Sequence, residues 1–214
     1  MKDIYNKDCN SWIKYKNICD GLGSNWIFRG QSSSKQMSST LERALESWCI
    51  EALNGPKLEE VLIREFRRLY DGPHSRLVRS DTLYCISVMQ HYGSPTRLLD
   101  FSYSPYVAAY FALNKGKAES TVYCINREWI LKSAESAVGF KVVNDRNCDA
   151  KRNDSSFLPL YMTSPYKKFV LIENPVILND RLIIQQGTFI CQGDMSISLM
   201  DNIRNHYCPN VVVR

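Results

Sequence analysis

The sequence predicts an α+β domain in which a helical N-terminal half packs on a mainly antiparallel sheet. Apolar residues recur at helical spacing through much of residues 39–91, whereas the strand-like segments gather in the C-terminal half. No shift in composition, Pro/Gly/Ser-rich linker or internal repeat divides the 214 residues. We therefore expect residues 1–214 to form a single domain.

Composition limits the class of protein. The apolar fraction of 44% can supply one core, and the net charge of +5 suits a small anionic ligand as well as a nucleic acid. The eight cysteines are scattered, without a Cys-x-x-Cys pair or a histidine at metal-binding spacing, so we expect reduced, mostly buried thiols and no metal site. The N-terminus lacks an apolar signal core, and the longest apolar run, residues 106–113, is too short to cross a bilayer. These features favour a cytoplasmic protein without a membrane partner.

The first elements predicted are a weak helix over residues 8–20 and a short strand over 25–30. Trp12, Tyr15 and Cys19 lie on one side of that helix. Residues 31–38 are polar, rich in serine and expected to be mobile.

Two amphipathic helices come next. Ser39 and Glu42 form a capping-box pattern, which predicts a helix that ends at Gly55-Pro56. Its expected buried stripe is Leu41, Leu45, Trp48 and Ala52. A second helix is predicted over residues 58–70, closed by Gly72-Pro73.

The middle of the chain alternates helices and strands. Ser80-Asp81 is expected to cap a helix that ends near His91, and the Gly-Ser-Pro turn at 93–95 leads to a strand over residues 97–101. Ser104-Pro105 predicts the start of a helix over 105–113, which is apolar on nearly all sides and therefore expected to be buried. A core strand is predicted over 121–125.

The last third is predicted to contain a long polar loop followed by strands. The loop covers residues 144–156. The strands are expected at 169–172, 181–185 and 188–191, with a weaker one at 211–213. The chain stops soon after an apolar segment, and we expect a domain cut from a longer protein.

Residues 90–100, Gln-His-Tyr-Gly-Ser-Pro-Thr-Arg-Leu-Leu-Asp, hold the densest polar chemistry of the chain. An imidazole, a phenol, a guanidinium and a carboxylate fall within eleven residues, between apolar segments on both sides. This pattern indicates a polar site held by a packed scaffold.

Two segments together resemble one protein family. Residues 26–31, Trp-Ile-Phe-Arg-Gly-Gln, resemble the Phe-Arg-Gly signature of the FRG domain, and residues 89–101 with Ser104-Pro105 and residues 108–112 are similar to its longest motif. The signature region covers about residues 20–125, followed by a strand-rich part at about 126–214 that includes Arg181 and Gln-Gln-Gly-Thr-Phe at 185–189. The resemblance implies a single FRG-like domain of bacteria and phages, with a place in conflict systems such as phage defence.

A remoter resemblance is to ADP-ribosyltransferases of the arginine–serine–glutamate type, and it implies an ADP-ribosyltransferase-like fold. Arg29, the segment 97–104, and Gln185 or Gln186 would occupy the three characteristic positions. The resemblance implies NAD as substrate or ligand and requires no other cofactor. Arg29 would hold the pyrophosphate, with Gly30 allowing the backbone to approach it. The expected ligand-binding residues are Arg29, Gly30, Gln31, Tyr92, Thr96, Arg97, Ser102 and Ser104.

The expected catalytic residues are His91, Asp100, Gln185 and Gln186. Cleavage of the nicotinamide–ribose bond builds positive charge on the sugar, which a carboxylate would stabilise. The transferases place a glutamate on the late strand, where this chain has Gln185 and Gln186. A glutamine can bind a ribose hydroxyl but cannot act as a base, so Asp100 or His91 would have to supply that function.

Structural roles compete with several of these assignments. Arg97 and Asp100 could form an ion pair, Arg29 could pair with Asp100 across adjacent strands, and His91 could cap a helix end. One of Gln185 and Gln186 should point inward and the other outward if both lie in a strand.

Three functions are therefore considered. The first is a nucleotide-binding domain with ADP-ribosyltransferase or NAD glycohydrolase activity. The second is a non-catalytic nucleotide sensor or binding module. The third is a nucleic-acid-binding effector that uses the arginines at 64, 67, 68, 76 and 79, which otherwise form a solvated basic face. A protein target is also compatible with the first.

Overall fold

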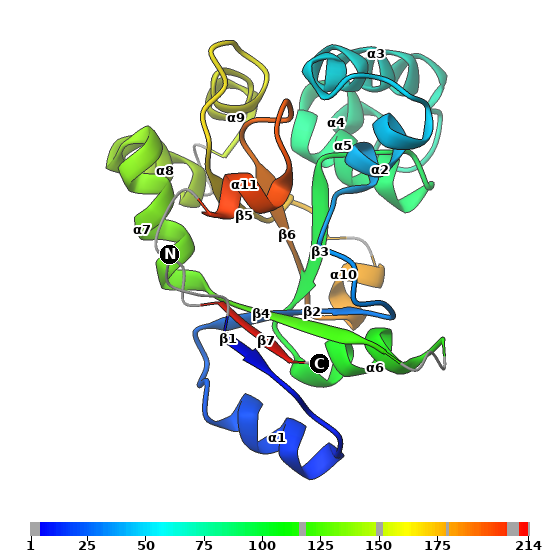
Figure 1. The fold of residues 1–214 in the computed structure, drawn as a ribbon. Helices are drawn as coiled ribbons and strands as arrows, with labels where there is room; N and C mark the ends of the chain where they lie inside the picture. Colours follow the sequence, from blue (N-terminus) through cyan, green and yellow to red (C-terminus); the bar gives the residue numbers. More distant parts are fainter. Residues whose placement is uncertain (1–4, 116–118, 149–151, 179, 205–209, 214) are drawn as a thin grey trace.

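The computed structural model describes residues 5–115, 119–148, 152–178, 180–204 and 210–213. Within them it contains eleven α-helices, a 3₁₀-helix at Ala52–Asn54 and seven strands, which confirms the α+β class (Figure 1). The helices are α1 (Trp12–Asp20), α2 (Thr40–Ser47), α3 (Gly55–Leu69), α4 (Ser75–Ser80), α5 (Thr82–His91), α6 (Pro105–Leu113), α7 (Arg127–Val138), α8 (Phe140–Asn147), α9 (Asp154–Tyr161), α10 (Asp180–Ile184) and α11 (Leu199–Arg204).

The strands form one mainly antiparallel sheet in the order β1-β7-β4-β2-β3-β6-β5. Five of them, β4-β2-β3-β6-β5, are antiparallel throughout, and β7 and β1 extend the sheet beyond β4, with β1 parallel to β7. The strands are β1 (Tyr5–Lys7), β2 (Trp26–Gln31), β3 (Leu98–Ser102), β4 (Thr121–Asn126), β5 (Val170–Glu173), β6 (Gly187–Gln192) and β7 (Asn210–Val213).

The sheet is nearly divided between β2 and β3. β2 pairs with β4 over six residues, and β3 pairs with β6 over five, but β2 and β3 share the single pair Phe28–Ser102. Figure 1 shows the consequence: β3, β6 and β5 run in a clearly different direction from β2, β4 and β7. We call this junction the strand crossing.

Helix α6 packs directly on β2 at the strand crossing. Gly30 makes this approach possible, because a Cβ atom on it would lie 1.7 Å from the carbonyl oxygen of Ala108 and 2.7 Å from the amide nitrogen of Ala112. Both contacts are with backbone atoms, which a rotamer change cannot relieve. Gly30 therefore allows the backbone of α6 to approach β2, whereas the sequence analysis expected it to allow the approach of a pyrophosphate.

Three of the four apolar clusters found among the described residues pack on the sheet. The largest packs α3, α4, α5 and α9 against one side of β3, β6 and β5. A second lies between the two parts of the sheet and contains Ile27 and Ile125 from one part and Leu99 and Ile190 from the other. The third joins α1 and α6 to β2 and β4.

Local signals located several helix starts correctly. The capping box of Ser39 and Glu42 opens α2, Asp81 accepts a hydrogen bond from the Tyr84 amide at the start of α5, and Ser104 caps α6. The predicted strands over 25–30, 121–125, 188–191 and 211–213 are confirmed as β2, β4, β6 and β7 with small shifts in their bounds.

Other predictions were wrong. The predicted long loop over residues 144–156 is wrong for 144–147, which lie in α8, and for 154–156, which begin α9. Five of the eleven described helices lie after residue 126. Helices are therefore not confined to the N-terminal half. Residues 181–184 lie in α10, so no strand covers 181–185. Gly55-Pro56 does not end a helix but begins α3, as proline suits the first turn.

The prediction that α6 is buried on nearly all sides was also wrong. Helix α6 buries only its alanines at 108, 109 and 112, while Tyr106, Tyr110 and Leu113 are exposed. Four of the seven described cysteines are buried, and all seven are free thiols. No helix in the described part of the chain is long and apolar enough to cross a membrane.

We predict that Gly30→Ala will destabilise the fold by more than about 3 kcal/mol, because the new methyl group overlaps the backbone of α6. Gly21→Ala is the matched control: its added Cβ would meet atoms no closer than 3.4 Å, and its φ of −72° suits alanine. Urea unfolding of both variants measures the difference. Equal stability of the two variants would contradict the packing argument.

Candidate functional site

A cavity of about 140 Å³ opens at the strand crossing. A much smaller cavity adjoins it on the side of α5, and Asp100 and Arg181 line both. Together we call them the crossing cleft. Its polar lining comes from β2, α5, β3, α10 and the turn after α10, and the side chains are Arg29, Ser87, Gln90, His91, Asp100, Ser102, Arg181 and Gln185.

Arg29 is the arginine that β2 brings to the cleft. Its Nη1 donates to the main-chain carbonyl of Asp100 at 2.7 Å, while its Nε is buried without a hydrogen-bond partner among the described residues. Burial lowers the pKa of Arg29; Asp100 opposes this shift, and the nearby guanidiniums of Arg43 and Arg181 add to it. The described residues contain no ion pair between Arg29 and the Asp100 carboxylate. Arg29 thus retains donor capacity inside the cleft.

Asp100 is held by a chain of hydrogen bonds from α5. The Nε2 of Gln90 donates to the Oδ1 of Asp100 at 2.8 Å, and the hydroxyl of Thr96 donates to the Oε1 of Gln90 at 2.5 Å. The Thr96 bond fixes which end of the Gln90 amide faces the carboxylate. Asp100 is also the only carboxylate among the described residues that line the cleft.

Thr96 acts through Gln90, since it is fully buried and lines neither part of the cleft. Its amide and carbonyl both bind the Thr40 hydroxyl, which ties the Gly-Ser-Pro turn to α2. The sequence analysis did not select Gln90, although it stands at the start of the motif that was singled out. Gln90 is recognisable as a site residue only once the structure shows that α5 ends beside β3, where Gln90 contacts Asp100.

The turn after α10 forms the opposite wall. Ser102 donates its hydroxyl to the carbonyl of Gln185 at 2.7 Å, and the amide of Tyr103 donates to the carbonyl of Gln186 at 2.9 Å. Neither glutamine lies in a strand. Gln185 lines the cleft, whereas Gln186 is exposed and has a positive φ of 47°. Gln186 is thus a turn residue and not the strand residue that the sequence predicted.

Arg181, on the exposed side of α10, is the second arginine of the cleft. Its Nε lies 3.5 Å from the Oε1 of Gln185, a long hydrogen bond. Sequence analysis noted Arg181 only as part of a family pattern. Its place in the cleft follows from the turn that brings α10 back toward β3.

Four other candidates are peripheral or outside the cleft. His91 is exposed and lines only the smaller cavity. Tyr92 packs edge-on against Tyr70, the residue that follows α3, and its ring lines neither cavity. Gln31 donates to the carbonyl of Lys35 and the hydroxyl of Ser33, and thereby closes the loop after β2. Ser104 caps α6.

Arg97 has a structural environment, not a ligand-binding one. It is fully buried beside Glu59 of α3, with its Nε 2.6 Å from the Oε2 of that carboxylate. Its Nη1 donates to the carbonyls of Tyr161 and Gln192, which lie at the ends of α9 and β6. Arg97 lines neither part of the crossing cleft, and its ion-pair partner is Glu59, not Asp100.

Most of the basic cluster on α3 is engaged within the chain. Arg64 and Arg68 both bind Glu65, and Arg67 binds the Val78 carbonyl and the Thr82 hydroxyl. Arg76 and Arg79 are exposed on α4. These contacts reduce the positive charge that the cluster offers to a polyanion.

We predict that Arg97→Met will cost about 3–5 kcal/mol of unfolding free energy, because it leaves the Glu59 carboxylate buried without its counter-ion. The double variant Arg97→Met/Glu59→Met should be more stable than the single one. Arg68→Met, which breaks an exposed pair with Glu65, is the control and should cost less than about 1 kcal/mol. Urea unfolding distinguishes these values, and a small effect of Arg97→Met would refute the structural role.

The comparisons with known proteins identify one family. The model of the FRG domain matches residues 24–121, a range that contains Arg29, Gln90 and Asp100 and ends before Arg181. No curated protein and no solved structure matches the chain, so the comparisons give no support to an ADP-ribosyltransferase likeness. Residues 24–121 of this chain are therefore an FRG domain.

Proposed function

We propose that the crossing cleft binds the phosphate groups of a nucleotide such as NAD. The observation that carries the proposal is the convergence of two arginines, Arg29 and Arg181, on one cavity, with the Nε of Arg29 buried and unpartnered. A buried donor of this kind normally has a partner, and a phosphate oxygen is a strong acceptor for a guanidinium.

The size of the cavity limits what it encloses. At about 140 Å³ it is smaller than the roughly 300–1,000 Å³ of sites that surround a whole small molecule. It would therefore hold the pyrophosphate, while the nucleoside parts lie along its open side. The amide of Gln185 is placed to bind a ribose hydroxyl.

The proposed activity is transfer of ADP-ribose or hydrolysis of NAD. Loss of nicotinamide leaves positive charge on the ribose, and Asp100 is the carboxylate available to stabilise it. Gln90 orients Asp100 by donating a hydrogen bond to its Oδ1. The Oδ2 atom has no hydrogen bond from any of the described residues. In a hydrolysis, water would replace nicotinamide as the group bonded to the ribose carbon, and no oxidant or reductant is needed.

A non-catalytic nucleotide sensor is the second candidate. The observation that favours it is that the described lining of the cleft pairs the single carboxylate of Asp100 with two amides, Gln90 and Gln185, and with no second acid. An amide binds hydroxyls without balancing a developing positive charge. A nucleic-acid target through the arginines of α3 and α4 has less support, because three of the five are engaged with neighbouring groups.

We expect Arg29→Lys to weaken NAD binding by about tenfold or more, because a lysine cannot donate two hydrogen bonds in a fixed plane. Arg76→Lys, an exposed substitution on α4, is the control and should leave the affinity unchanged. Isothermal titration calorimetry with NAD measures both. Absence of NAD binding by the unaltered protein would overturn the proposal.

Asp100→Asn separates the two candidates. For an enzyme, this nearly isosteric change should reduce nicotinamide release by about a hundredfold while NAD affinity changes little. For a sensor, the unaltered protein binds NAD and releases no nicotinamide. Chromatographic detection of nicotinamide beside the calorimetry decides between them.

A further inference from the structure

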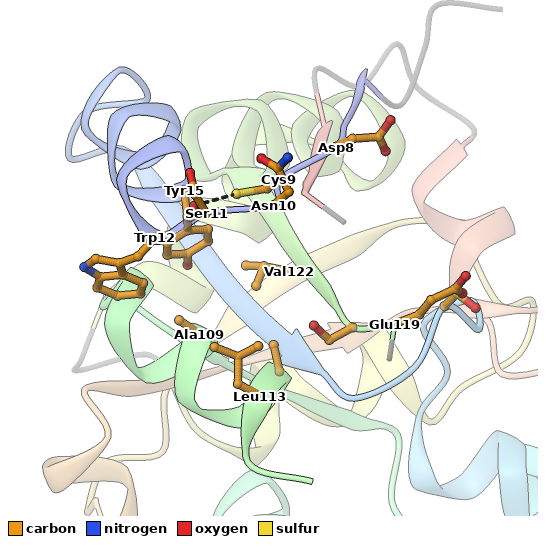
Figure 2. A pocket seen from close by; sticks show the side chains of 13 residues that line it. Asp8, Cys9, Asn10, Ser11, Trp12, Tyr15, Ala109, Leu113, Glu119 and Val122 are labelled. Carbon is orange, nitrogen blue, oxygen red and sulfur yellow. Dashed lines mark hydrogen bonds between the residues drawn. The ribbon is translucent and has the colours of Figure 1, made fainter. Parts of the chain in front are cut away.

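A second cavity lies on the other side of α6 from the crossing cleft. It has a volume of about 620 Å³, and Figure 2 shows it between α1, α6 and the start of β4. The two cavities share no lining residue: Ala109, Ala112 and Leu113 of α6 face this one, whereas Val107, Ala108 and Phe111 face the cleft. We call it the α1–α6 pocket.

One wall of the α1–α6 pocket is apolar and firmly held. Small side chains at Ala109, Ala112 and Val122 leave the space open. Tyr15 is buried, and its hydroxyl donates to the carbonyl of Pro105 at 2.7 Å. Burial raises the pKa of Tyr15, so the phenol stays neutral at physiological pH.

Trp12 gives the pocket an accessible aromatic face. Its side chain is 51% exposed, and its ring stacks on Tyr15 with the centroids 5.6 Å apart. Ser11 caps α1 by accepting the Lys14 amide, and its carbonyl accepts the Cys9 thiol, the bond dashed in Figure 2. These contacts fix the chain where it enters the helix and hold Trp12 at the mouth of the pocket.

The rim of the pocket is acidic. Asp8 and Glu119 are both exposed and lie at the end opposite Trp12 in Figure 2. No lysine or arginine occurs among the described residues that line the pocket, although the chain as a whole carries a net charge of +5. The local charge therefore opposes phosphates and carboxylates and favours a cation.

From these observations we infer that the α1–α6 pocket binds a small organic cation with an aromatic or aliphatic body, such as an arylalkyl amine. The volume lies within the range of sites that enclose a small ligand. The apolar wall and the exposed indole of Trp12 take the aromatic or aliphatic body, and the ammonium group points toward the carboxylates of the rim at the other end. This site is independent of the nucleotide proposed for the crossing cleft.

Three probes of nearly equal shape test the inference. Tryptamine carries a positive charge, tryptophol is neutral and indolepropionate is negative. We expect the full chain to bind tryptamine most tightly and indolepropionate most weakly in isothermal titration calorimetry. Equal affinities, a preference for the anion, or no binding of tryptamine at millimolar concentration would each overturn the inference.

Variants then locate the bound cation. Glu119→Gln and Asp8→Asn should each weaken tryptamine binding about threefold, as expected for exposed charges, and leave tryptophol unaffected. Asp20→Asn, an exposed aspartate at the end of α1 that does not line the pocket, is the matched control and should change nothing. Trp12→Leu should weaken tryptamine and tryptophol binding alike, about fivefold or more, because both lose the aromatic contact.

Arg29→Lys distinguishes this site from the crossing cleft. It should leave tryptamine affinity unchanged even where NAD binding is lost, because Arg29 does not line the α1–α6 pocket. Tryptamine binding that depends on Arg29 and ignores Trp12 would place the cation in the cleft and contradict the inference. If NAD does not bind but tryptamine does, the proposal for the crossing cleft is wrong and the inference for the α1–α6 pocket stands.

Discussion

The single backbone pair between β2 and β3 is the constraint on which the candidate site depends. Beyond Phe28 and Ser102 the two strands diverge, although a continued register would place Gly30 opposite Asp100. At this position the carbonyl of Asp100 accepts a hydrogen bond from the guanidinium of Arg29 instead of from a β2 amide. The divergence thus opens a cavity and at the same time directs an arginine into it.

Helix α6 can occupy the same region because residue 30 has no side chain. Its backbone touches β2 where any Cβ would overlap it, and the alanines at 108, 109 and 112 keep the contact close. As a result α6 separates two cavities of opposite character. One has an arginine-rich lining and the other an acidic rim, so the two sides of the same helix border cavities of different charge.

The arginines of this fold divide into structural and available ones according to their partners. Arg97 with Glu59 and Arg146 with Glu173 are buried pairs, and both are tied to Tyr161: its carbonyl accepts Arg97, and its hydroxyl donates to Glu173. This network joins α3, α8 and α9 to the ends of β3, β5 and β6. Within the described part of the chain, Arg29 has a carbonyl partner and one nitrogen without a hydrogen bond, so its donor capacity is not used up by the fold.

The sequence by itself determined the α+β class, the FRG signature and those elements whose signals are local. A capping serine or aspartate satisfies amides within its own turn, so the starts of α2, α5 and α6 could be predicted without knowledge of any other segment. Only the tertiary structure decided which polar residues meet. Arg97 and Asp100 are three residues apart, yet the first binds Glu59 of α3 and the second binds Gln90 of α5. Arg181 in α10 and Gln185 in the turn after α10 both line the cleft. Both lie in a segment whose apolar residues indicated a strand. The reason is physical: burial and pairing of a charged group depend on segments distant in sequence, whereas helix capping depends on its neighbours.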